Sequence, residues 1–150
     1  MKRIVLCLLL LASAAVATGQ VQNPVNWTFA AKKISANTYD IIMSAAVQPG
    51  WRIYSQSSPS GGPVATRIVL SPNPLLMKIG KVKETGKLQK AYDPNFKINV
   101  RYYNDRVQFV QTVRVNGNAG TNARGTIEYM VCNEHQCLPP VDKSFDVAVR

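Results

Sequence analysis

Residues 106–115 read Arg-Val-Gln-Phe-Val-Gln-Thr-Val-Arg-Val. Valines at positions 107, 113 and 115, with Phe109 between them, all follow a period of two residues. Successive side chains of a β-strand point to opposite faces of the sheet, so a period of two indicates a strand with one buried face. This segment is the clearest of several, and it predicts an all-β protein.

Shorter segments on both sides repeat this alternation or are rich in β-branched and aromatic residues. We expect strands at residues 38–47, 51–54, 65–70, 75–82, 126–131 and 143–149. Turn-forming sequences lie between them, namely Pro49-Gly50, Gly61-Gly62-Pro63, Asn104-Asp105 and Asn116-Gly117-Asn118. Sustained helical periodicity is absent from the sequence. Several short strands separated by turns within about 120 residues predict an antiparallel immunoglobulin-like β-sandwich. We expect Trp27 and Trp51 in its core.

The first 19 residues have the layout of a secretory signal peptide. Lys2 and Arg3 give a positive start, residues 4–17 are almost entirely apolar, and small residues follow at a cleavage site. The apolar run is shorter than the roughly 20 residues that span a bilayer. We therefore expect a leader at 1–19 that is removed and a single domain at 20–150. That domain would be periplasmic or otherwise exported, with no transmembrane segment in the mature chain.

The chain is strongly basic, with 18 Lys and Arg residues against 8 Asp and Glu. Five lysines, Lys78, Lys81, Lys83, Lys87 and Lys90, follow one predicted strand and its turn. No aromatic residues interleave with them and no nucleic-acid-binding motif is present, so we expect no nucleic acid partner. The charge is compatible with contact with an anionic membrane surface, or simply with a solvated lysine-rich face.

Two cysteines remain once the leader, with Cys7, is removed. They lie five positions apart in Cys132-Asn133-Glu134-His135-Gln136-Cys137, followed by Leu138-Pro139-Pro140, at the corner between two predicted strands. A disulfide is normal in an exported protein. A bridge here closes six residues and gives roughly 2 kcal/mol in the loop-entropy model, against roughly 4 kcal/mol for about sixty residues. A short exposed bridge also leaves a sulfur open to the in-line attack of thiol–disulfide exchange. The spacing alone leaves both a structural bridge and a redox pair open.

The segment 129–140, Tyr-Met-Val-Cys-Asn-Glu-His-Gln-Cys-Leu-Pro-Pro, resembles the active-site segment of the N-terminal periplasmic domain of the thiol:disulfide interchange protein DsbD. Residues 50–54, Gly-Trp-Arg-Ile-Tyr, are similar to that family's aromatic-rich strand. Residues 92–96, Tyr-Asp-Pro-Asn-Phe, fall where the family has a cap loop that shields the cysteines. The resemblance covers roughly residues 25–149.

The resemblance implies an immunoglobulin-like domain that passes electrons from a thioredoxin-like donor to oxidised periplasmic proteins, as a component of a protein-disulfide reductase. It also implies that Cys137 forms the mixed disulfides and Cys132 resolves them. The whole family protein has a membrane domain and a thioredoxin-like domain that this sequence does not contain, so we expect a separate donor. The alternative is a non-catalytic immunoglobulin-like binding module with a structural corner disulfide.

Four further residues are candidates for the surroundings of the cysteines. Tyr54 and Tyr92 would line a pocket or simply pack, and Phe96 would belong to the cap. His135 lies between the cysteines, where an imidazolium would lower a thiol pKa, or is an exposed loop residue. Cys132, His135 and Cys137 offer three metal ligands where structural zinc takes four, so we expect no metal and no cofactor.

Overall fold

The computed structural model describes residues 23–94, 96–117 and 120–150. The predicted leader at 1–19 lies outside the described residues. Every regular element in the described residues is a strand, and every strand pair is antiparallel. The strands are β1 Val25–Ser35, β2 Thr38–Val47, β3 Arg52–Tyr54, β4 Arg67–Leu70, β5 Leu76–Gly86, β6 Gln89–Asp93, β7 Ile98–Tyr103, β8 Arg106–Val115, β9 Thr121–Tyr129, β10 Val131–Cys132 and β11 Val141–Val149. Within the described ranges, no helix is long and apolar enough to cross a membrane.

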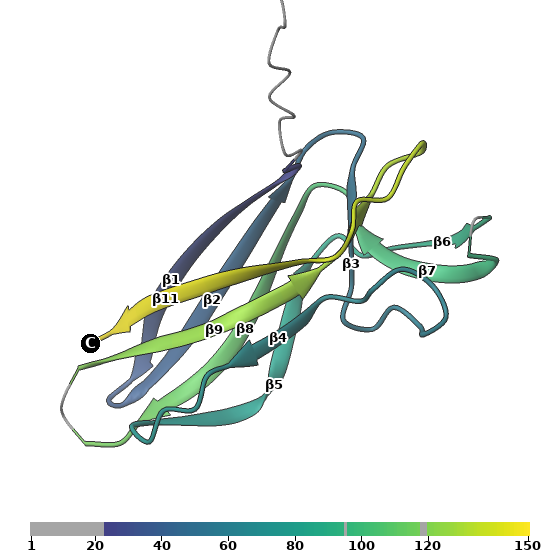
Figure 1. Ribbon diagram of the computed structural model, residues 1–150. Helices are drawn as coiled ribbons and strands as arrows, with labels where there is room; N and C mark the ends of the chain where they lie inside the picture. Colours follow the sequence, from purple (N-terminus) through teal and green to yellow (C-terminus); the bar gives the residue numbers. More distant parts are fainter. Residues whose placement is uncertain (1–22, 95, 118–119) are drawn as a thin grey trace, which may run out of the picture.

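The strands form three sheets, in the orders β1-β2-β8-β5, β11-β9-β4 and β10-β3-β7-β6. Figure 1 shows the long strands of the first two sheets as the body of the molecule, while the β6–β7 hairpin projects from one end. The third sheet lies at that end because β3 and β10 follow β2 and β9 after short connections, and β7 leads into β8. The predicted antiparallel immunoglobulin-like sandwich is confirmed.

The main core lies between the two larger layers and follows from the alternation of β2 and β8. Met43 of β2 faces Phe109 of β8 in register, and both are fully buried. Gln111 is the polar exception in the apolar series of β8, and it is buried too. Its Nε2 donates to the backbone oxygens of Ile79 and Thr112, at 3.1 and 2.9 Å, so the polar group is satisfied. Trp27 and Trp51 are buried as predicted.

The predicted strands 38–47 and 106–115 coincide with β2 and β8. Three strands were missed: β1, β6 and β7. β1 alternates between apolar and polar residues only in its first half and then continues as Lys-Lys-Ile-Ser. β6 is largely polar, and the sequence reading assigned residues 92–96 to a loop. In the structure Tyr92 and Asp93 are the last two residues of β6, paired with Asn99 and Ile98 of β7.

Candidate functional site

The two predicted cysteines are joined by a disulfide, with their Cα atoms 4.0 Å apart. Cys132 ends β10 and pairs with Cys137 in an isolated antiparallel bridge. Backbone bonds flank the sulfurs on both sides: Asn133 N donates to Gln136 O, and Leu138 N donates to Val131 O, each at 2.9 Å. The loop between the cysteines is therefore closed by backbone pairing as well as by the covalent bond.

The tip of this loop is a tight turn organised by one side chain. Asn133 Oδ1 accepts hydrogen bonds from the backbone N–H groups of His135 and Gln136, both at 2.8 Å. Asparagine side chains commonly stabilise turns in this way. His135, the predicted candidate between the cysteines, is exposed at this tip.

The two cysteines differ in exposure. Cys132 is 2% exposed and packs with Tyr54 and Val100 in a small apolar cluster, separate from the main core. Cys137 is exposed. Exchange requires an incoming thiolate to reach one sulfur along the S–S axis, so access favours attack at Cys137.

Tyr54 is the predicted pocket residue that the fold brings to the cysteines. Its side chain is fully buried, and its hydroxyl has no hydrogen-bond partner among the described residues. Burial raises the pKa of Tyr54 to about 12, while the positive charge of Arg52 acts in the opposite direction. Tyr54 is thus a neutral phenol beside Cys132 at physiological pH.

Arg52 belongs to the same site, although the sequence reading gave it no role. It lies directly opposite Cys132 in the β3–β10 pair, after the turn at Gly50, where φ is +83°. Its guanidinium lies over the Tyr102 ring, 5.3 Å from the centroid. Its Nη2 donates to Asn133 O at 3.4 Å. The one available signal was a charged residue in an otherwise apolar Trp-Arg-Ile-Tyr segment.

The predicted cap residues occupy two different places. Tyr92 is 60% exposed. Because side chains alternate along β6, it projects from the sheet face opposite to that of Asp93 and its partner Ile98. Ile98 packs against the cluster that contains Cys132, so Tyr92 points away from that cluster.

Phe96 is half-buried in the turn between β6 and β7. Its backbone N–H donates to Asp93 Oδ1 at 3.4 Å, and Asp93 is itself buried. Phe96 and Ile98 both approach Gly62 in the connection from β3 to β4. This turn therefore borders the cysteine cluster through Asp93, whose charge reaches Tyr54 and raises its pKa, and through Ile98.

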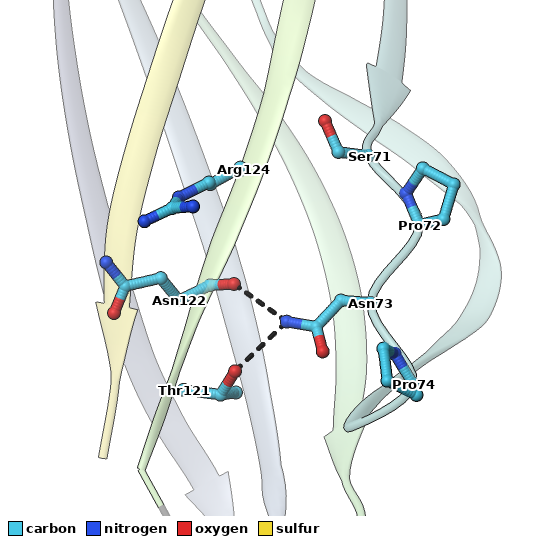
Figure 2. Close-up of a pocket in the computed structure, with 7 residues that line it drawn as sticks. All are labelled: Ser71, Pro72, Asn73, Pro74, Thr121, Asn122 and Arg124. Atoms are coloured by element: carbon cyan, nitrogen blue, oxygen red, sulfur yellow. Dashed lines mark hydrogen bonds between the residues drawn. The ribbon is translucent and has the colours of Figure 1, made fainter.

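Two of the concave surfaces lie at opposite ends of β9. A polar depression of about 410 Å³, lined by Ser71, Pro72, Asn73, Pro74, Thr121, Asn122 and Arg124, lies at the start of β9, whereas the disulfide follows its end (Figure 2). Asn73 Nδ2 donates across it to Thr121 Oγ1 and to Asn122 O, both at 3.0 Å (Figure 2). A more apolar groove, also of about 410 Å³, includes Leu138 and Pro139 directly after Cys137. Among the described residues, no three His, Cys, Asp or Glu side chains gather as a metal site.

The model of the family "Thiol:disulfide interchange protein DsbD, N-terminal" matches residues 19–149. No curated protein matches the chain. The N-terminal domain of DsbD from Neisseria meningitidis, in its reduced form, is 19% identical with a TM-score of 0.58, over 84% of this chain and 86% of that one. The N-terminal periplasmic domain of ScsB from Proteus mirabilis is 21% identical with a TM-score of 0.56, over 81% of this chain and 44% of that one.

A third solved structure contains the complex between the DsbD and PilB N-terminal domains of Neisseria meningitidis. Its similarity is 16% identity and a TM-score of 0.53, over 85% of this chain and 87% of that one. At these identities the solved structures establish the shared fold. The family model spans nearly all of the chain, including both cysteines. The chain therefore belongs to the family of N-terminal domains of the thiol:disulfide interchange protein DsbD.

Proposed function

We propose that this chain is a periplasmic thiol–disulfide exchange domain. It passes electrons through Cys132 and Cys137 from a thioredoxin-like donor to oxidised proteins of the cell envelope. The observation that carries the proposal is the asymmetry of the disulfide: one exposed cysteine at a corner and one buried against Tyr54. A structural disulfide would need no such access, whereas an exchange site needs one sulfur within reach of a partner.

The chemistry follows from that asymmetry. A donor thiolate attacks Cys137 Sγ, the Cys132–Cys137 bond breaks, and Cys132 leaves as a thiolate. The donor's second thiolate then attacks the donor sulfur of the mixed disulfide, so Cys137 leaves and the donor becomes a disulfide. Two electrons and two protons end on the cysteine pair. The reduced pair passes both to an oxidised protein by the same two steps, with Cys137 attacking and Cys132 resolving.

Two comparisons support the setting. The related ScsB domain is periplasmic. The DsbD N-terminal domain of Neisseria meningitidis forms a complex with another protein domain, that of PilB. Binding a folded thiol-bearing partner suits a sulfur at an exposed corner better than one inside a closed pocket.

Trapping tests both the function and the roles of the two cysteines. Cys132→Ala leaves Cys137 without its resolving partner, so mixed disulfides should accumulate when the variant is expressed in its own cell envelope. Cys137→Ala is the matched control and should trap little, because its remaining thiol is buried. Non-reducing electrophoresis followed by mass spectrometry identifies the adducts. No adducts with either variant would contradict exchange, and a higher yield with Cys137→Ala would reverse the roles.

A further inference from the structure

We propose that Arg52 is a positioning residue for this exchange, whose fixed positive charge stabilises the Cys132 thiolate released when Cys137 Sγ is attacked. The inference rests on the proposed function, because it concerns the same disulfide. It adds a residue from a strand far away in the sequence, and it gives the buried cysteine a defined role as a leaving group.

The fold holds the Arg52 side chain next to Cys132 from three directions. The β3–β10 register sets the two residues opposite each other, a relation that brings Cβ atoms to within about 5.5 Å in antiparallel sheets. The Tyr102 ring lies against the guanidinium, at 5.3 Å from centroid to Cζ. Asn133 O, one residue beyond Cys132, accepts from Nη2 at 3.4 Å. Stacking and hydrogen bonding together limit the freedom of an otherwise flexible side chain.

The charge is needed because of where Cys132 lies. Burial in apolar surroundings raises a thiol pKa and makes the sulfur a poorer leaving group. Cys132 is almost fully buried, with Tyr54 and Val100 against it. A cation at the adjacent cross-strand position opposes that effect. Arg52 has the same influence on the neighbouring Tyr54 hydroxyl, whose pKa its charge lowers against the larger effect of burial.

Other ionisable groups near the pair do not replace Arg52. Those on the surrounding elements are Tyr54 of β3, Asp93 of β6, Tyr102 of β7, and Glu134 and His135 of the loop. Neither tyrosine can carry a positive charge, and the two carboxylates repel a thiolate. His135 is exposed at the loop tip. Arg52 is thus the one permanent cation in this group.

The first test measures the thiol itself. In a Cys137→Ser background, the pKa of Cys132 is followed by thiolate absorbance against pH. Arg52→Gln should raise the pKa of Cys132 by about one pH unit. A nearby opposite charge lowers the pKa of an acid by about 1–3 pH units, and the lower end applies because Arg52 is only half-buried. Arg52→Lys should preserve most of the effect. Arg114→Gln removes the same charge from the exposed outer face of β8 and should change nothing.

The second test measures the bond. A dithiol such as dithiothreitol attacks Cys137 Sγ, Cys132 leaves as a thiolate, and the second thiol of the reagent closes its own disulfide. A rise of about one in the leaving thiol's pKa should slow this reduction about threefold in Arg52→Gln at fixed pH. Tyr102→Leu releases the guanidinium from its stack and should slow reduction partway, so the test does not depend on one variant folding.

An unchanged Cys132 pKa in Arg52→Gln, or an Arg52→Lys variant that behaves like Arg52→Gln, would overturn the proposal, because charge would then not be the cause. So would reduction rates that match the Arg114→Gln control. Both tests use only this protein and a small thiol. If trapping in the cell envelope fails while these effects appear, the proposed exchange with envelope proteins is wrong, but the effect of Arg52 on the Cys132 thiolate and on reduction by a small thiol stands.

Discussion

Two buried tyrosines show how far chemically identical side chains can differ in their surroundings. The Tyr54 hydroxyl has no hydrogen-bond partner among the described residues. The Tyr103 hydroxyl donates to Glu84 Oε2 at 2.8 Å. The pKa of both is raised: burial acts first on each, and the hydrogen bond to Glu84 adds to it for Tyr103. Comparing the two tyrosines therefore separates the effect of burying a phenol from the effect of giving its hydroxyl a hydrogen bond.

Removing each hydroxyl should have different consequences. Tyr54→Phe removes an unsatisfied polar group, so the free energy of unfolding at pH 8 should stay within about 1 kcal/mol of wild type. Tyr103→Phe loses a bond to a charged acceptor and should cost about 1.5–3 kcal/mol. Urea denaturation measures both. Equal losses in the two variants would mean that the Tyr54 hydroxyl is also bonded in solution.

The Tyr54→Phe variant also tests how stability depends on pH, and the direction of the effect follows from the raised pKa of Tyr54. Tyr54 keeps its proton in the folded state up to about pH 12, whereas an unfolded tyrosine loses it near pH 10. Its contribution is therefore constant below about pH 10, and stability falls as pH rises from there toward 12. Tyr54→Phe should show a shallower loss across this window in urea denaturation. An identical slope would contradict the burial of the phenol.

Residue by residue, the sequence identified the two cysteines and their neighbour Tyr54, but not Arg52. The cysteines stand out because they are the only two after the predicted leader, and their spacing and the residues that follow are distinctive. Arg52 was missed because it meets Asn133 across 81 positions of sequence. That contact depends on the β3–β10 register, which no local pattern encodes.

At the scale of elements, the β6–β7 hairpin contains Tyr92 and Asp93, which the sequence predicts to lie in a loop. Its pairing continues as far as Asp93 and Ile98, so the turn itself is short. Its strands were harder to predict than β8 because the third sheet has a small apolar cluster on one face, and β6 is an edge strand with exposed lysine and tyrosine side chains. Strong alternation arises only where one face is fully covered.

The turn should still limit access to the cysteine cluster, through Phe96 rather than Tyr92. Phe96→Ala should speed reduction by dithiothreitol and cost less than about 2 kcal/mol, because a half-buried ring loses less than the 3–5 kcal/mol of a fully buried one. Tyr92→Ala is the natural control, since that ring projects from the other face. Equal rates in wild type and both variants would show that the turn does not gate the disulfide.

The connection between β3 and β4 is fixed at its start by one carboxylate. Glu84 of β5 accepts hydrogen bonds from Ser55 Oγ at 2.7 Å and from Gln56 N at 2.6 Å, in addition to the one from Tyr103. The serine, glycine and proline content of the β3–β4 connection correctly predicts a loop. The anchoring residue comes from a different sheet, which composition does not reveal. Further along the same connection, Gly62 lies close to Phe96 and Ile98.

For the molecule as a whole, one edge of the β1-β2-β8-β5 sheet carries three exposed lysines. Lys78, Lys81 and Lys83 of β5 are exposed, and Met77 beside them is 47% exposed. Cations next to exposed apolar side chains suit an anionic lipid surface, with about 1 kcal/mol per lysine near the surface. Contact with an anionic membrane surface, one of the two interpretations that the composition allows, therefore stays a prediction to be tested at this edge.

We expect the protein to sediment with vesicles that contain phosphatidylglycerol but not with pure phosphatidylcholine vesicles. Changing Lys78, Lys81 and Lys83 to Glu should weaken binding at least roughly hundredfold, from the per-lysine contribution. The matched control changes Lys32, Lys97 and Lys143, which are also exposed but lie elsewhere, to Glu. Equal losses in the two variants would mean that net charge, not the β5 edge, determines binding.

The reduced protein should remain folded, because an exchange domain must work with its bond both open and closed. Backbone hydrogen bonds from Asn133 to Gln136 and from Leu138 to Val131 close the loop without the sulfurs. Opening the bond should therefore lower the free energy of unfolding by only about 2 kcal/mol, the value for a six-residue loop. Urea denaturation of oxidised and reduced protein measures this difference, with the Cys132→Ser/Cys137→Ser variant as a control for the reductant.

The reduction potential of the Cys132–Cys137 bond separates the two functional readings. Structural disulfides lie below about −300 mV, so equilibration with glutathione should give this bond a less negative potential. Unfolding on reduction, with a potential below that value, would favour the binding module with a structural corner disulfide.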